Sequence, residues 1–201
     1  MKKLLTITTA AVLLAIPGAL QADTITFSNL PGPTDATYSG STEGAFTVTP
    51  TLGLWFQGLI YGNPLPSIYA GPIGGPTNST IQITDLGSTF RFVSLDYSSN
   101  NAGGTFEIQG FLGASMLFDQ IGSLNASLPP SFGFTTLLGS NSGISMDRLT
   151  IEVMPGIGTT SINLDNIIVS AVPEGEASLP LLAIGLAAVF FWRKAQTVSV
   201  G

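Results

Sequence analysis

The sequence contains no cysteine and no histidine. The first absence excludes disulfide bonds and a thiolate nucleophile, and the second removes the commonest general base; together they remove the usual zinc ligands. Basic residues are also scarce, since between the two ends of the chain only Arg91 and Arg148 carry a positive charge, against ten acidic residues. This excess of negative charge argues against a nucleic-acid partner, and the absence of lysine from the same region excludes a phosphate loop built on lysine.

Residues 172–201 combine a short acidic segment, an uncharged apolar run and a basic pair. Val172-Pro173-Glu174 opens the segment, residues 177–192 are uncharged, and Arg193-Lys194 follow directly. A helix of that length, at about 1.5 Å per residue, spans roughly 24 Å. Because positive residues flank the cytoplasmic end of a membrane helix, the pattern predicts a transmembrane helix over 177–192 with the rest of the chain outside the cytoplasm. A buried core helix is the alternative for so short a run.

This arrangement resembles the PEP-CTERM sorting signal of exported proteins in some Gram-negative bacteria, with Gly175 where the family motif usually has a second proline. The resemblance implies that an exosortase-type membrane protease recognises Val172, Pro173 and Glu174, that Arg193 and Lys194 stop transfer, and that the helix is then removed. The protein would end at the cell surface or in the extracellular polymer layer. The resemblance implies a destination and no biochemical activity.

The N-terminus agrees with export. Lys2 and Lys3 precede an apolar stretch over residues 4–16, and Ala22 ends a small-residue cleavage site. This order is typical of a signal peptide over residues 1–22, read by the Sec export machinery. An uncleaved anchor is the alternative, although the apolar stretch is short for a membrane span. One exported domain is therefore expected over residues 23–171.

The central region alternates apolar and polar residues in short runs separated by Gly, Asn, Ser and Pro, as in Phe90-Arg91-Phe92 and Phe106-Glu107-Ile108. Period-two runs with turn residues between them predict an all-β fold, an antiparallel β-sandwich or jelly roll. Loops are expected at 29–44 and 62–78. The expected strands cover residues 23–27, 45–49, 81–84, 89–97, 104–111, 114–120, 132–138, 147–154 and 161–170.

The central region also resembles exported galactose-binding-like jelly-roll domains. The resemblance rests on the order of three segments, Phe90 to Asp96, Gly110 to Gly113 and Leu164 to Ile167. It implies that the first and last strands lie side by side, with residues 23–27 near 164–169.

The same resemblance implies a structural calcium ion where the first and last strands meet. Its candidate ligands are Asp165 with Asp23 or Glu43. Calcium binds carboxylate, amide and carbonyl oxygens, which this acidic and Asn-rich region supplies. The alternative is that Asp165 and its neighbour form an ordinary polar strand edge.

Aromatic residues flank the loop at 62–75. Trp55, Tyr61 and Tyr69 are candidates for stacking on sugar rings, as in a carbohydrate-binding module. Core packing is the alternative. Trp55 and Phe56 are adjacent, so on a strand they would point to opposite faces, and at most one could serve each role.

A pair of carboxylates is the one catalytic arrangement that the composition allows. Glu107 and Glu152 lie on expected neighbouring strands, and two carboxyl groups at about 5–9.5 Å would fit a glycosidase. No local motif supports this reading, so we expect no enzyme. The sequence favours a non-enzymatic surface or matrix protein, structural or adhesive in biofilm exopolysaccharide, with a carbohydrate-binding module second and a glycosidase third.

Overall fold

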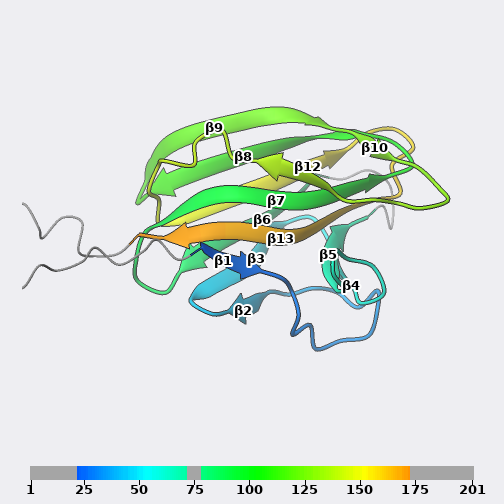
Figure 1. Ribbon diagram of the computed structural model, residues 1–201, viewed down its shortest axis with the longest axis horizontal. Helices are drawn as coiled ribbons and strands as arrows, with labels where there is room; N and C mark the ends of the chain where they lie inside the picture. Colours follow the sequence, from blue (N-terminus) through cyan, green and yellow to red (C-terminus); the bar gives the residue numbers. More distant parts are fainter. Residues whose placement is uncertain (1–21, 72–77, 173–201) are drawn as a thin grey trace, which may run out of the picture. The chain divides into compact units, whose positions relative to one another are not determined.

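The computed structural model describes residues 22–71 and 78–172, and every regular element in these ranges is a β-strand (Figure 1). In this part of the chain no helix provides an apolar stretch long enough to cross a bilayer. Most of the predicted signal peptide and nearly all of the predicted sorting tail, including Pro173, Glu174, Arg193 and Lys194, lie outside the described residues. Export and sorting therefore stay predictions.

The strands form two sheets, here named sheet A and sheet B. Sheet A contains β1 (Ala22–Ile25), β4 (Trp55–Gly58), β5 (Ser67–Ala70), β7 (Phe90–Asn100), β10 (Ala126–Ser127), β11 (Thr135–Leu138) and β13 (Ser161–Ala171). Sheet B contains β2 (Ser41–Glu43), β3 (Phe46–Leu52), β6 (Ser79–Asp85), β8 (Gly104–Leu112), β9 (Ser115–Leu124) and β12 (Arg148–Pro155).

The order of pairing is that of a jelly roll. Of the eight strands β5 to β9 and β11 to β13, the first pairs with the last, β5 with β13, and the next pairs are β6 with β12, β7 with β11 and β8 with β9. All four pairs are antiparallel, and successive pairs alternate between the sheets. The predicted all-β sandwich is therefore confirmed, and its jelly-roll form follows from this nested pairing.

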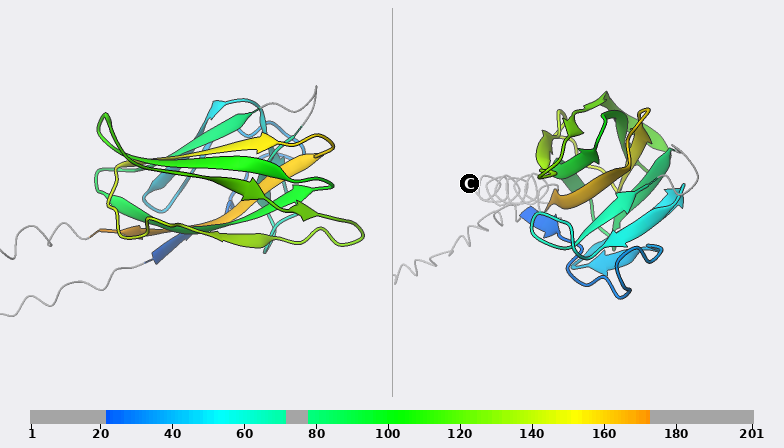
Figure 2. Two further views of the ribbon diagram at one scale, coloured as in Figure 1. Left: turned by 90° about the horizontal axis from the view of Figure 1, so that it is seen from above. Right: turned by 90° about the vertical axis from the view of Figure 1, so that its right-hand side faces the viewer.

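Strand alternation builds the core between the sheets. On β12 the inward residues Leu149, Ile151 and Val153 are buried while their neighbours are partly exposed. Phe46 of sheet B meets Phe90 of sheet A edge to face, with ring centroids 5.4 Å apart. Figure 2 shows the two sheets from above and from one end. With no disulfide available, this apolar packing is the main source of stability.

The first and last strands lie side by side, as the resemblance implied. β1 pairs antiparallel with β13, so that Asp23 lies opposite Val169 and Ile25 opposite Ile167 (Figure 1). Sequence analysis missed β5, because Ser67 to Ala70 stands between Pro66 and Gly71 in a stretch rich in loop-forming residues. The missed strand matters, since it carries one wall of the candidate site.

Candidate functional site

Polar residues lie on the outer face of sheet A, the face that points away from the core and that in a sandwich usually meets solvent. Three pairs of residues face each other there across β7 and β13: Asn100 with Ser161, Ser98 with Asn163, and Asp96 with Asp165. We call these six residues the polar ladder. Directly opposed residues point to the same face of a sheet, so the ladder forms one continuous surface.

Most of the ladder is buried, because connecting segments fold over it. Ser98 is 1% exposed, Asn163 3% and Asp165 0%. One cover is the segment between β4 and β5, whose Tyr61 hydroxyl lies 2.9 Å from both Ser98 Oγ and the carbonyl oxygen of Phe132. The Tyr61 ring packs against Phe134 at a centroid distance of 5.1 Å. These contacts hold two loops together above the sheet.

At the Asn100 end of the ladder the cover leaves a pocket of about 210 Å³. Tyr61 and Tyr69 line it from above and beside the ladder, and Asp35 contributes from the loop that precedes β2. The described residues of the lining are Thr34, Asp35, Gly58, Ile60, Tyr61, Tyr69, Asn100, Ser161 and Asn163. Aromatic rings combined with a few hydrogen-bonding groups are typical of small-ligand sites.

Tyr69 is fixed in position on two sides. Its ring stacks on Phe56, its direct neighbour on β4, with centroids 5.4 Å apart and an interplanar angle of 27°. Its hydroxyl donates a 2.6 Å hydrogen bond to Asp35 Oδ1. Burial, together with this bond and the charge of Asp35, raises the pKa of Tyr69 above its ordinary value. The phenol therefore stays a neutral donor, and its ring is held at a set angle to the pocket.

The ladder groups in the pocket are oriented by hydrogen bonds among themselves. Ser161 Oγ accepts from Asn100 Nδ2 at 3.0 Å and from Asn163 Nδ2 at 3.2 Å. Asn163 Nδ2 also lies 3.3 Å from the carbonyl oxygen of Ser98, and Ser98 Oγ donates to Asn100 Oδ1 at 2.8 Å. Because these amides are pre-oriented, a ligand that bonds to them would not have to order them.

The other end of the ladder is closed. Asp165 accepts bonds from two backbone N–H groups, that of Asn63 at 2.6 Å and that of Asn166 at 2.8 Å. Asp96 Oδ2 accepts from the side-chain amides of the same two asparagines, and Asp96 Oδ1 accepts from Thr136 Oγ1 at 2.6 Å. Burial, opposed by the two backbone bonds and assisted by the charges of Asp96 and Glu43, raises the pKa of Asp165 to about 6. The Asp96 and Asp165 end of the ladder therefore anchors the covering loop, and the pocket lies at the Asn100 end.

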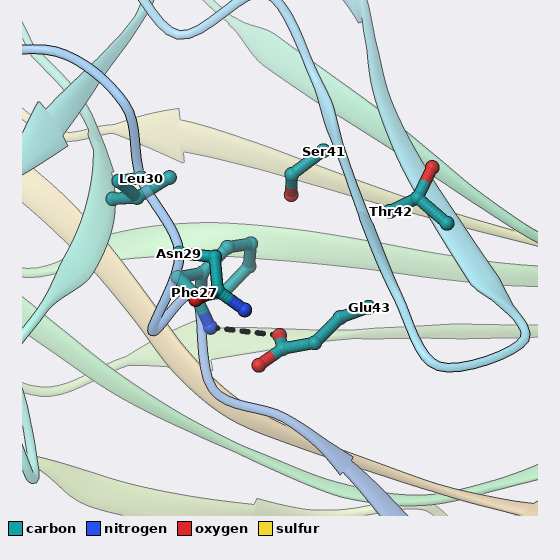
Figure 3. Close-up of a pocket in the computed structure, with 6 residues that line it drawn as sticks. All are labelled: Phe27, Asn29, Leu30, Ser41, Thr42 and Glu43. Atoms are coloured by element: carbon teal, nitrogen blue, oxygen red, sulfur yellow. Dashed lines mark hydrogen bonds between the residues drawn. The ribbon is translucent and has the colours of Figure 1, made fainter.

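The three predicted calcium ligands have separate roles in this structure. Glu43 lies in a small hollow (Figure 3), where its carboxylate accepts from the backbone N–H groups of Thr26 and Phe27 at 2.8 and 3.0 Å. Phe27 has a positive φ of 57°, which turns its N–H toward the same carboxylate. Glu43 thereby joins β2 of sheet B to the chain leaving β1, while Asp23 is partly exposed on β1.

In the described ranges no group of three or more acidic side chains is arranged to hold a metal ion. Asp165 and Glu43 are close enough for the charge of one to affect the other. However, each carboxylate is engaged by N–H or O–H donors of the chain. Calcium binding by Asp165 with Asp23 or Glu43 stays a prediction.

The structure decides between the two readings of Trp55. Its side chain is 1% exposed and belongs to the core cluster, so the ring cannot stack on a sugar, and the stacking prediction for this residue is wrong. The adjacent Phe56 points to the outer face and supports Tyr69, as alternation requires. Tyr61 and Tyr69, the other two predicted residues, both line the pocket.

Glu107 and Glu152 do lie on neighbouring strands, directly opposite each other on β8 and β12. Both are on the outer face of sheet B, since their strand neighbours Phe106, Ile108, Ile151 and Val153 point into the core. Burial, followed by the charges of Asp119 and Glu152, raises the pKa of Glu107. The side-chain amide of Asn78 donates to Glu152 at 2.8 Å. This face has no covering loop comparable to that of sheet A among the described contacts.

Comparison with known proteins finds similarity to solved structures alone. No family model and no curated protein matches the chain. Among solved structures, it is similar to a family 29 carbohydrate-binding module from Piromyces equi, at 14% identity over 76% of this chain and 91% of the other, with a TM-score of 0.43.

Two further solved structures are similar. One is the K1 cleaved adhesin domain of Lys-gingipain from Porphyromonas gingivalis, at 10% identity over 76% of this chain and 99% of the other, with a TM-score of 0.45. The other is a family 32 carbohydrate-binding module from C. perfringens NanJ in complex with galactose, at 15% identity over 60% and 93% of the chains and a TM-score of 0.40. At such low identities and TM-scores, what this chain binds follows only from its own residues.

The polar residues that line the pocket were not predicted from the sequence. Asn100, Asn163 and Asp35 were not candidates, although a signal for two of them was present. Polar residues recur at every second position along Asp96-Tyr97-Ser98-Ser99-Asn100 and along Ser161-Ile162-Asn163-Leu164-Asp165. Such alternation marks an outward face, but a covering loop above that face cannot be read from it. Asp35 had no signal, since its position depends on the loop around it.

Proposed function

We propose that residues 23–171 form a non-catalytic carbohydrate-binding module, which holds a sugar unit of an extracellular polysaccharide in the pocket between Tyr61 and Tyr69. The observation that carries the proposal is the convergence of two tyrosines with the oriented amides of Asn100 and Asn163 in one open pocket. Sugar rings present apolar C–H faces and hydroxyl edges, and this lining offers aromatic surface for the first and hydrogen-bonding groups for the second.

The proposal places the module outside the cell. It combines with the sequence-based expectation of a Sec signal peptide over residues 1–22 and a PEP-CTERM-like tail over 172–201, processed by an exosortase-type protease. A sugar-binding module delivered in this way would act as an adhesive or structural component of the cell surface or of a biofilm matrix. Its excess of acidic residues keeps it soluble and gives it no attraction to nucleic acid.

Catalysis is not proposed for the Glu107 and Glu152 pair. The two residues lie on the uncovered face of sheet B, away from Tyr61 and Tyr69. Hydrolysis of a glycoside needs a sugar ring held between the two carboxyl groups with a water in place. A flat strand surface provides no such positioning.

The test is affinity electrophoresis of the full chain in gels containing candidate exopolysaccharides. Tyr69→Ala removes the ring that Phe56 supports, and we expect it to lose roughly two- to tenfold in affinity, since one stacked aromatic ring contributes about 0.5–1.5 kcal/mol. Phe111→Ala is the matched control, because Phe111 is a partly buried aromatic residue on sheet B, beneath Arg148, and does not belong to the described lining of the pocket. Equal retardation of wild type and Tyr69→Ala would refute the assignment of the pocket.

A further inference from the structure

Among the described residues, Asp35 is the one charged side chain in the lining of the pocket at the Asn100 end of the ladder. Asp35 is exposed to solvent, and its Oδ1 accepts the hydroxyl of Tyr69 at 2.6 Å. A carboxylate can accept further hydrogen bonds on its second oxygen. A ligand entering between the tyrosines would therefore meet a fixed negative charge.

The backbone around Asp35 holds this charge in place. The N–H of Asp35 donates to the carbonyl oxygen of Gln57 on β4 at 2.8 Å, and Asp35 has a positive φ of 67°. Gln57 is buried and its side chain accepts from the N–H of Gly32 at 2.9 Å, which fastens the start of the same loop. The loop is thus attached to the edge of sheet A at several points, and its carboxylate is a built part of the pocket wall.

The cations of the described part of the chain are elsewhere. Arg148 lies over the Phe111 ring on sheet B at 4.1 Å from the centroid, and the Nε of Arg91 donates to Ser145 Oγ at 3.3 Å. Neither arginine belongs to the pocket lining. An acidic sugar in the pocket would therefore bring its carboxylate toward Asp35 without a partner of opposite charge, and such like-charge juxtaposition is unfavourable when both groups lose water.

We infer that the pocket selects glycans built from uncharged or amino sugars and rejects those built from uronic acids, with Asp35 as the residue that sets this preference. The inference rests on the proposed function and names its substrate class. A sugar hydroxyl or ammonium group donates a charge-assisted bond to the carboxylate, whereas a uronate is repelled by it. The carboxylate oxygens of Asp35 thus attract uncharged or amino sugars and repel uronic acids.

The experiment compares two oligosaccharides of the same linkage and length, one of neutral hexoses and one oxidised at C6 to uronic acids. Affinity of the full chain for each is measured by isothermal titration calorimetry at low and high salt. We expect wild type to prefer the neutral form by roughly fivefold or more at low salt, and the preference to shrink at high salt, because salt screens charge repulsion.

The variants separate the role of Asp35 from that of net charge. Asp35→Asn keeps the shape of the side chain and an acceptor for the Tyr69 hydroxyl, and we expect it to bind the uronic form more tightly so that the preference falls by several-fold. Asp119→Asn removes one exposed carboxylate from β9 on sheet B and should leave the preference as in wild type. Circular dichroism confirms that each variant is folded.

The affinity measurements on wild type and on the variants can each overturn the inference. Equal wild-type affinity for the neutral and uronic forms, or a preference that Asp35→Asn leaves unchanged, overturns the inference while the proposed sugar site stands. A wild-type preference that does not depend on salt also overturns the inference. This measurement needs no variant, so it holds even if a variant fails to fold. If wild type binds no oligosaccharide of either form across glucose, galactose and mannose series, the proposed function fails and the inference fails with it.

Discussion

The two outer faces of the sandwich have similar polar residues in different surroundings. Each carries a pair of carboxylates on directly opposed positions of antiparallel strands: Asp96 with Asp165 on sheet A, and Glu107 with Glu152 on sheet B. Asp165 is fully buried beneath the segment that contains Asn63, whereas Glu107 and Glu152 are partly exposed. The difference lies in the covering loops, which among the described residues bury the carboxylates of sheet A and leave those of sheet B partly exposed.

The polar face of sheet A has a structural role at its buried end, and the pocket at its open end is where we propose that sugar binds. On sheet A the buried end of the ladder fastens the loop, and the loop then positions Tyr61 at the open end. On sheet B the same type of side chain meets water, which screens the charge and supplies hydrogen bonds. The three predictions that follow test this contrast.

The largest effect is expected for Asp165→Ala. The substitution leaves the backbone N–H groups of Asn63 and Asn166 without their acceptor beneath the loop. Each buried unsatisfied N–H costs about 1–3 kcal/mol, and removal of the buried charge offsets part of this, so we expect a net loss of about 2–4 kcal/mol in the free energy of unfolding. Urea unfolding followed by circular dichroism measures it. A loss no greater than that of Glu107→Ala would contradict the contrast between the faces.

The second effect is a dependence on pH that belongs to Asp165. Its pKa in the folded state, about 6, lies above the ordinary value of 3.8, so between these values the folded chain binds a proton that the unfolded chain has released. The stability that this group contributes is therefore fully present below about pH 3.8 and is lost as the pH rises through about 6. At about 1.4 kcal/mol per pKa unit the change is on the order of 2–3 kcal/mol.

The free energy of unfolding of wild type and of Asp165→Ala is measured at pH 4.5 and at pH 7.5. The other carboxylates titrate in both proteins, so the difference between the two proteins reports the pH-dependent contribution of Asp165. Asp96→Asn should reduce it, because the charge of Asp96 is one cause of the raised pKa of Asp165. A difference between wild type and Asp165→Ala that is the same at both pH values would show that Asp165 is not desolvated in solution.

The smallest effect is expected for Glu107→Gln and Glu152→Gln. Each removes one of two like charges that face each other on an open sheet, which should change stability by less than about 0.5 kcal/mol, with a slight gain from lost repulsion. Neither should alter glycan affinity, and no hydrolysis should be found in wild type for either substitution to remove. Release of reducing sugar by wild type, abolished by one of these substitutions, would support the glycosidase reading instead.

The sandwich could be predicted from the sequence because its signal is local. Alternation along residues 89–97, 104–111 and 147–154 marks strands wherever they lie, and the observed strands β7, β8 and β12 match these ranges to within one residue at their starts. The neighbouring positions of β1 and β13 followed from the resemblance to jelly-roll domains. The short strands β2, β5 and β10 were missed, since each has four residues or fewer and lies among turn-forming residues.

The site could be predicted only in part. Tyr61 and Tyr69 were recognisable as aromatics beside a loop, whereas Trp55, chosen by the same rule, is in the core. Adjacent positions on a strand face opposite ways, so the rule selects the right face only when strand register is known. Asp35 and the ladder residues come together through contacts between distant segments, such as the Tyr69 bond to Asp35, and no local pattern encodes these.

The most direct test of the central claim is to observe which face a glycan contacts. The full chain, labelled with nitrogen-15, is titrated with the polysaccharide fragment that retards it in gels, and the side-chain amide signals of Asn and Gln are followed by nuclear magnetic resonance. Binding in the pocket predicts shifts for Asn100 and Asn163 and none for Gln82 and Gln109 on the outer face of sheet B. Shifts confined to Gln82 and Gln109 would place the ligand on the uncovered face and contradict the account.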